Sequence, residues 1–263
     1  MVSKIVKVTR IKEWFHFLGV PILGYIFKSS QVYWMDIILI IIVGVATLSY
    51  GFIINYWANI NDDYRPSSWL IVSSLSLIPT AILVLILYPQ AYIFWFLTVL
   101  FLFLYSFPPF TLKRFPVIVT LINSISLALF FLFGLTIKGE LTFPGLIFSL
   151  FLGLNLVPLQ LIHEWKHKEE DLKNGCMSTA ALLSPQKIKG ILITLYTLIL
   201  IFSFYLYRFI EINFFRELSL IFVISSLILL IYFNKNKKVV ESRKYLKLAG
   251  VIYSIGILIL LIL

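Results

Sequence analysis

The sequence has few charged residues and almost no cysteine. Only 13% of its 263 residues are charged, about half the share typical of a soluble domain, while 60% are apolar and 17% aromatic. Such a chain cannot cover a globule with polar surface, which excludes a soluble enzyme, a disordered segment and a fibrous protein. The single Cys176 excludes a disulfide framework and a cysteine-cluster metal site. These absences leave an all-α, polytopic membrane protein.

Long apolar runs recur along the chain. A membrane span needs about 20 apolar residues, and only helices or closed barrels satisfy the backbone in lipid. The runs are continuous rather than alternating, which favours helices over a barrel. The first run follows several basic residues as a signal peptide would, but no small-residue cleavage site follows it, so we predict an uncleaved helix. Nine transmembrane helices are predicted, at 13–28, 34–56, 69–88, 91–107, 116–136, 143–162, 188–208, 218–233 and 245–263.

The basic residues predict the orientation. With the N-terminus in the cytoplasm, all but four of the 22 Lys and Arg residues fall on the inner side. This bias accounts for the net charge of +10 without a nucleic-acid partner. With no repeat or linker in sight, we expect a single transmembrane domain over 1–263, with 163–189 as a cytoplasmic loop, in a bacterial or archaeal cell membrane. The four exceptions are Lys28, Lys138, Arg208 and Arg216.

A first polar cluster follows the second predicted span. Asn55, Asn59 and Asp63 are spaced four residues apart, which places three side-chain oxygens on one helical face. Oxygen donors suit a hard cation such as Mg²⁺. The alternative is that these residues only end the span and cap the chain that follows.

A second cluster, His163-Glu-Trp-Lys-His-Lys-Glu-Glu-Asp171, follows the sixth predicted span. Glu164, His167 and Asp171 would share one helical face, and Gly175 is a candidate for ending that helix. One alternative is a solvated charged loop whose ion pairs contribute little. Another is zinc held by His163 and His167, because the segment fits the H-E-x-x-H pattern.

A third element reads Tyr105-Ser-Phe-Pro-Pro-Phe-Thr-Leu-Lys-Arg114. The two prolines should end the preceding helix and turn the chain, which leaves Lys113 and Arg114 at the membrane surface. Basic side chains in such a place can bind a phosphate, Arg through a planar fork and Lys as a point charge. The alternative is ordinary anchoring of the inner membrane face by basic residues.

Taken together, the three elements resemble the UbiA superfamily of intramembrane prenyltransferases, whose members form a bundle of nine helices. Each element lies in the loop where the family has a motif, after the second, fourth and sixth helices. The match is spread over residues 55–179. The matching residues are Asn55, Asp63, Tyr105, Ser106, Pro108, Pro109, Leu112, Lys113, Arg114, Asp171, Gly175, Ser178 and Thr179.

The resemblance implies a chemistry. In the family, Mg²⁺ bound by the two acidic motifs holds the diphosphate of an isoprenoid donor, basic residues help to neutralise it, and an aromatic or lipid acceptor attacks as diphosphate leaves. Here Tyr56, Asn59 and His167 stand where the family has carboxylates. We therefore expect one reduced Mg²⁺ site shared by Asp63 and Asp171. The residues assigned to metal or diphosphate are Asn55, Asn59, Asp63, Tyr105, Lys113, Arg114, His167 and Asp171, with Asp62, Glu164, Glu169 and Glu170 near enough to substitute.

Two other functions stay open at this stage. A family member that has lost transfer, and only binds an isoprenoid lipid, would fit the missing carboxylates. A membrane transporter would use polar residues inside the spans, such as Asn123, Asn155 and Gln160, since polar groups in lipid are commonly functional.

Overall fold

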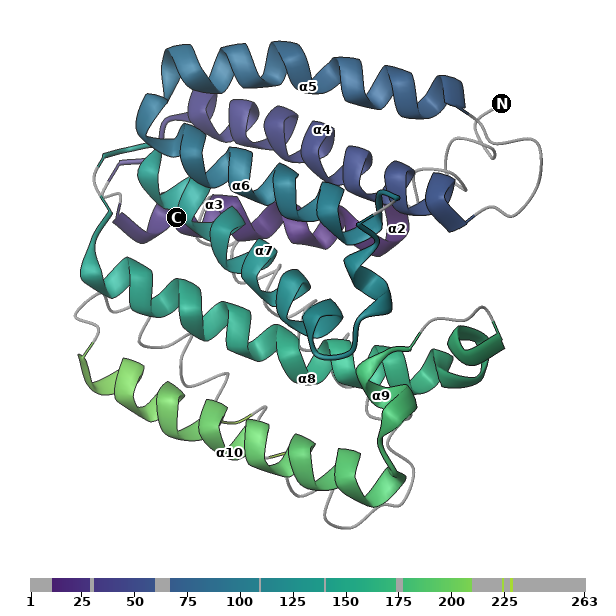
Figure 1. Ribbon diagram of the computed structural model, residues 1–263. Coiled ribbons are helices and arrows are strands. Elements are labelled where there is room, and N and C mark those ends of the chain that lie inside the picture. Colours follow the sequence, from purple (N-terminus) through teal and green to yellow (C-terminus); the bar gives the residue numbers. More distant parts are fainter. Residues whose placement is uncertain are drawn as a thin grey trace. The chain divides into compact units, whose positions relative to one another are not determined.

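The computed structural model describes residues 11–28, 31–59, 67–108, 110–139, 141–173 and 177–209, together with positions 224 and 228. All regular structure in these ranges is helical (Figure 1). The elements are α2 (Ile11–Trp14), η1 (Phe15–Leu18), α3 (Gly19–Lys28), α4 (Trp34–Asn59), α5 (Ser67–Leu87), α6 (Pro89–Ser106), η2 (Leu112–Arg114), α7 (Ile118–Thr136), α8 (Phe143–Lys173), α9 (Thr179–Leu182) and α10 (Pro185–Phe209).

Six of these helices, α4 to α8 and α10, are long and apolar enough to cross a membrane. Each coincides with one predicted span. The predicted spans at 218–233 and 245–263 lie outside the described residues except for positions 224 and 228, and the orientation of the N-terminus stays a prediction.

The first predicted span, 13–28, is not one continuous α-helix. A 3₁₀ turn, η1, separates the four residues of α2 from α3. Pro21 explains why a helix restarts at Gly19, because proline lacks an N–H and fits best in a helix's first turn, where that N–H would have no partner.

The sixth predicted span continues well past residue 162. Helix α8 runs 31 residues to Lys173, so much of the loop predicted for 163–189 is helical. The segment after His163 is rich in Glu and Lys and holds no Gly or Pro before Gly175, and such a sequence extends a helix. The prediction that Glu164, His167 and Asp171 share a helix is confirmed, while Gly175 lies outside the described residues.

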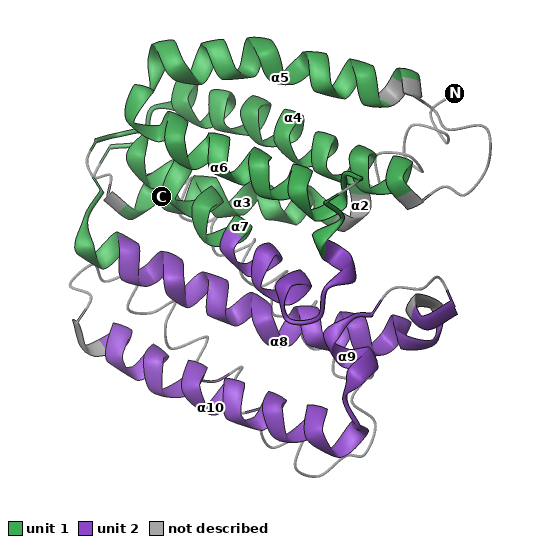
Figure 2. Ribbon diagram, in the orientation of Figure 1, with its two compact units in different colours: residues 1–112, 126–145, 256–263 green, residues 113–125, 146–255 purple. Residues whose placement is uncertain are grey.

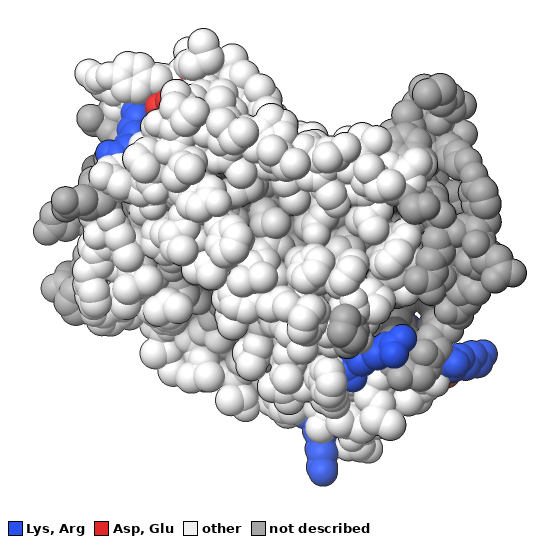
Figure 3. Space-filling model, turned by 45° about the horizontal axis from the view of Figure 1, so that its top comes forward, with Lys and Arg blue, Asp and Glu red and all other residues white. Residues whose placement is uncertain are grey.

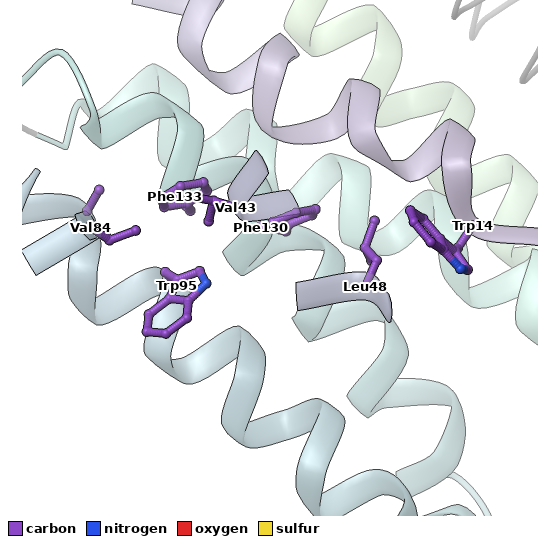
Figure 4. Close-up of a cluster of buried hydrophobic side chains, with 8 residues drawn as sticks. Trp14, Val43, Leu48, Val84, Trp95, Phe130 and Phe133 are labelled. Atoms are coloured by element: carbon purple, nitrogen blue, oxygen red, sulfur yellow. The ribbon is translucent and has the colours of Figure 1, made fainter. Parts of the chain in front are cut away.

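The chain divides into two compact units (Figure 2). Unit 1 comprises residues 1–112, 126–145 and 256–263, and unit 2 comprises 113–125 and 146–255. The core of unit 1 gathers side chains from α2 and α4 to α7 (Figure 4). Within it Trp95 Nε1 donates a 2.9 Å hydrogen bond to Thr47 Oγ1, so the indole has a partner away from water. The core residues are Trp14, Val43, Leu48, Val84, Ala91, Trp95, Phe130 and Phe133.

Helices α3 and α7 meet backbone to backbone inside unit 1. A Cβ atom at Gly24 would overlap the carbonyl oxygen of Phe131, and one at Gly134 would overlap the carbonyl of Pro21. Glycine at such a crossing lets two membrane helices approach closely, so their van der Waals contact is extensive.

Unit 2 packs α10 against α8. Phe151 meets Phe202 edge to face, with ring centroids 5.5 Å apart, while Ile188, Leu192 and Ile199 are buried. Many large apolar side chains of the described helices are exposed, and on the face shown in Figure 3 charged side chains are few and lie near its margins. A surface of this kind suits lipid, because a soluble monomer rarely exposes such large apolar areas.

Candidate functional site

The end of α4 carries the first polar cluster. Asn55 and Asn59 lie one turn apart in its last two turns, and Asn55 is half-buried. Trp57 stacks on Phe107 with ring centroids 6.0 Å apart, which ties this end of α4 to the residue that follows α6. Asp63 lies outside the described residues.

Helix α6 ends just before Pro108, as predicted. Helix α6 stops at Ser106, and Phe107 is extended with φ −75° and ψ 126°, the conformation that a following proline imposes. Tyr105 occupies the last turn and is half-buried. Phe103 and Phe107 stack with centroids 4.5 Å apart, so aromatic packing fixes the exit from the helix.

Lys113 and Arg114 form most of η2, the short 3₁₀ helix between α6 and α7. Lys113 is half-buried and Arg114 is exposed. The backbone on both sides is unusual, because Thr111 has φ 37° and Val117 has φ 65°, values that residues with a Cβ rarely adopt. Strained backbone of this kind is concentrated at functional sites.

The last turns of α8 carry the second cluster. The ring centroids of His163 and His167 are 4.8 Å apart, and Asp171 lies one turn beyond His167. Nothing further is described of the Asp171 side chain. In the described ranges, no three His, Cys, Asp or Glu side chains lie close enough together to hold a metal ion.

Glu164 is the centre of a buried network in unit 2. Its side chain is 3% exposed. Oε1 accepts hydrogen bonds from Thr120 Oγ1 at 2.8 Å and from Gln160 Nε2 at 3.4 Å, and Oε2 accepts from the Ala180 amide at 3.2 Å. The carboxylate that an H-E-x-x-H zinc site would use as its base is thus bonded to α7 and α9.

Thr179 extends this network toward Lys113 and Arg114. Its Oγ1 lies 3.0 Å from Thr120 Oγ1 and accepts a 2.8 Å hydrogen bond from the Val117 amide. Ser178, next to it, is buried with its Oγ unpartnered in the described part of the chain. Sequence reasoning placed Glu164 on one helical face with His167 and Asp171 and named it as a substitute ligand, but it did not predict this network. The signal that it missed was the spacing of Gln160 and Glu164, which puts two polar side chains one turn apart near a membrane-spanning stretch.

A second polar group lies at the opposite end of α4 in unit 1. Asp36 accepts 2.7 Å hydrogen bonds from the phenols of Tyr25 and Tyr88. Lys138 lies over the rings of Tyr25 and Tyr33, 4.5 and 4.4 Å from their centroids. Burial, with the hydrogen bond to Asp36, raises the pKa of Tyr88, so its phenol stays a donor. The group joins α3, α4 and the turns after α5 and α7, and sequence reasoning did not find it.

The predicted site residues divide between the two units (Figure 2). Asn55, Asn59 and Tyr105 belong to unit 1. Unit 2 holds the rest of the described set, namely Lys113, Arg114, His167 and Asp171. Within unit 2, the segment that follows Arg114 and the Ser178–Thr179 motif are joined by the hydrogen bond from Val117 to Thr179.

Comparisons with known proteins agree on one family. The model of the UbiA prenyltransferase family matches residues 18–251. No curated protein matches the sequence significantly. A UbiA homologue from Archaeoglobus fulgidus bound to GPP and Mg²⁺ superimposes with a TM-score of 0.81 at 17% identity, over 97% of this chain and 96% of that one.

Two further structures show the same fold. The Archaeoglobus fulgidus homologue bound to DMAPP and Mg²⁺ gives a TM-score of 0.76 at 16% identity, covering 97% of this chain and 98% of the other. A digeranylgeranylglyceryl phosphate synthase gives 0.71 at 22% identity, covering 98% and 97%. At these identities the structural likeness shows a shared fold and nothing more.

Proposed function

Because the chain belongs to the UbiA prenyltransferase family and has its helical fold, we propose that it is an intramembrane prenyltransferase. It would move an isoprenoid chain from a prenyl diphosphate to an aromatic or lipid acceptor and release diphosphate. The observation that carries the proposal is the hydrogen bond from the Val117 amide to Thr179, since it joins the chain three residues after Arg114, the last residue of one family motif, to the Ser-Thr segment of another. Two segments that would face one diphosphate are thereby held together in unit 2.

The basic segment supplies the anion-binding groups. Arg114 is exposed and offers a planar fork of donors to phosphate oxygens, and Lys113 adds a compact positive charge. Together they would hold the diphosphate and neutralise part of the negative charge that grows as the bond to the prenyl carbon breaks. The apolar helices would hold the isoprenoid chain and exclude water that would otherwise quench the allylic cation.

The donor set of the two acidic motifs fits Mg²⁺. Asn55 and Asn59 lie one turn apart on α4, and Asp171 lies one turn after His167 on α8. With Asp63 they provide the amide and carboxylate oxygens that this cation prefers, while His167 is the poor member of the set. Bound there, Mg²⁺ would supply positive charge beside the departing diphosphate. The Archaeoglobus fulgidus homologue, whose structures hold Mg²⁺ with GPP or DMAPP, supports this assignment.

Mg²⁺-dependent binding of GPP to the detergent-purified protein tests the proposal. We expect binding with Mg²⁺ and, in the presence of an acceptor, release of diphosphate. Asp63→Asn and Asp171→Asn should each reduce diphosphate release about a hundredfold or more. Losing a residue that merely hydrogen-bonds to a metal ligand already lowers metal affinity or activity about 10- to 100-fold, and these two residues are expected to bind the metal directly. Full turnover in both variants would refute the ligand assignment.

Charge variants of the basic segment complete this test. Lys113→Gln and Arg114→Gln should weaken GPP binding, whereas Lys187→Gln is the matched control, because Lys187 is an exposed lysine at the start of α10. Equal losses in all three would mean that the effect is one of general surface charge. GPP binding without diphosphate release from any acceptor would favour a second function, binding of an isoprenoid lipid without transfer. Tyr56, Asn59 and His167, at positions where the family has carboxylates, favour that alternative.

A further inference from the structure

Among the described residues, Glu164 is the only buried side chain that carries a formal charge. Burying a carboxylate in a membrane protein costs much free energy unless donors surround it, so its retention calls for a role. Donors reach it from three places in the chain. Thr120 comes from α7, Gln160 from α8 itself, and the Ala180 amide from α9.

The hydrogen bonds around Glu164 form a chain with one direction. The Val117 amide donates to Thr179 Oγ1, which leaves the Thr179 hydroxyl proton for Thr120 Oγ1, because Thr120 gives its own proton to Glu164. Such a chain needs an acceptor at its end. A carboxylate has only acceptor oxygens, so Glu164 satisfies Thr120 through one oxygen and the Ala180 amide through the other.

Glutamine could not replace Glu164 in this arrangement. It has the same shape, but one of its two terminal atoms is an NH₂ group that only donates. Facing the Ala180 amide, that group would break the bond to Ala180. Facing Thr120, it would donate to the hydroxyl, reverse the direction of the chain so that the Thr179 proton loses Thr120 as its acceptor, and displace the bond from Gln160. A buried donor left without a partner costs more free energy than a hydrogen bond contributes when formed.

The far end of the chain lies at the basic segment. Val117, whose φ of 65° is strained for a β-branched residue, is held by its bond to Thr179 and lies three residues after Arg114. The other branch ends on the Ala180 amide, directly after the Ser178–Thr179 motif. One buried carboxylate therefore fixes the backbone of both segments.

We propose that Glu164 is a positioning residue that holds the Lys113–Arg114 segment and the Ser178–Thr179 segment together for one diphosphate. The proposal rests on the proposed function for its ligand, and on the geometry of unit 2 for its mechanism. In this role Glu164 would bind neither the diphosphate nor the metal. It acts through Thr120, Thr179 and Val117.

Hydrogen exchange of the full-length protein in detergent tests the mechanism without reference to activity. The variants are Thr120→Val, which removes the hydroxyl at nearly constant volume, Thr120→Ser, which keeps it, and Glu164→Gln. Thr197→Val is the matched control, because the Thr197 hydroxyl donates to the Ile193 carbonyl of its own helix and to no other group in the described part of the chain. Peptides that contain the Val117 and Ala180 amides report the two ends of the network.

We expect exchange at Val117 to speed up about tenfold in Thr120→Val and in Glu164→Gln, with Ala180 affected in Glu164→Gln as well. Thr120→Ser and Thr197→Val should exchange like the wild type at both amides. Because Thr120→Val changes no buried charge, it stays informative if Glu164→Gln does not fold. Unchanged exchange at Val117 in Thr120→Val would overturn the proposal.

GPP binding to the same variants connects the network to the ligand. Thr120→Val should raise the dissociation constant of GPP, and KM with it, about tenfold, while kcat changes less, because the groups that bind diphosphate are present but displaced. Thr120→Ser should restore binding. Faster exchange at Val117 with unchanged GPP affinity would overturn the positioning role. If the wild type binds no GPP but the variants show the expected exchange pattern, the proposed function is overturned and the network is supported.

Discussion

Val117 is β-branched and 55% exposed, yet its φ is 65°. A residue with a Cβ in this region costs about 1–3 kcal/mol, and the cost is greatest for a branched side chain. Its amide is bonded to Thr179, so the strain persists because the hydrogen bond and the turn into α7 hold it. The segment from Lys113 to Val117 thus carries two basic side chains and a strained backbone, and Val117 is bonded into the buried network around Glu164.

Replacing Val117 by Asn should stabilise the protein. Asn tolerates this backbone region, and the exposed Val side chain buries little surface that would be lost. We expect the free energy of unfolding to rise by about 1 kcal/mol, which corresponds to a few degrees in Tm. The intrinsic fluorescence of the six Trp residues reports the transition in detergent.

Val117→Ala provides the control for that change. Ala removes the β-branching but lacks the short polar side chain with which Asn hydrogen-bonds locally in this backbone region, so its gain should be clearly smaller than that of Asn. If Val117→Asn melts at or below the wild-type temperature, the strain is not stored at this residue.

Individual site residues differed in how far sequence predicted them. Lys113 and Arg114 were placed correctly after a broken helix, because Pro108 constrains the residue before it whatever the fold. The burial of Glu164 was not predictable, since an acidic residue in a charged run looks the same in the sequence whether it is buried or solvated. Its donor Thr120 lies 44 residues away in the sequence. Only the packing of α7 on α8 joins them.

At the level of elements, the crossing of α3 and α7 brings two backbones into close contact. Gly24 and Gly134 both lie where a Cβ atom would overlap main-chain atoms of the other helix. Backbone cannot rotate aside as a side chain can, so an added methyl group must separate the helices. Sequence showed glycines in both segments but could not reveal which ones face a partner helix.

Gly134→Ala should therefore be destabilising, whereas Gly190→Ala should not. We expect the first to lose about 2 kcal/mol or more through overpacking. A Cβ at Gly190 meets nothing within 4 Å, so alanine there should stabilise α10 by up to about 1 kcal/mol through its higher helix propensity. Thermal unfolding of the two purified variants measures the difference. Equal melting temperatures would mean that α3 and α7 do not cross at Gly134.

Sequence predicted the existence of helices better than their bounds. All six candidate spans were found, because an apolar run of this length has few alternatives in lipid. The first span was predicted as one helix but is interrupted by η1, and α8 extends 11 residues beyond the predicted end at 162. Hydropathy indicates where a chain is apolar, whereas helix ends depend on proline position and on local helix propensity.

For the whole molecule, the distribution of basic residues predicts an inner N-terminus and an outer C-terminus. Fusions of green fluorescent protein and of alkaline phosphatase at several points along the chain test this topology. Green fluorescent protein should fluoresce at the N-terminus and after Lys173, and the phosphatase should be active after Phe209 and after Leu263. Fluorescence at both termini would require an even number of spans and would contradict the predicted nine.

The tight α3–α7 crossing also has a consequence for how the protein is made. Helix α3 has 10 residues, about 15 Å of length, which is half of what a bilayer core requires. Its glycine face is completed by a helix whose Gly134 leaves the ribosome more than a hundred residues after Pro21. At a synthesis rate of about 5–20 residues per second, α3 is made roughly 5–20 seconds before α7, the helix that it packs against. The insertion machinery is therefore expected to retain the segment during that interval.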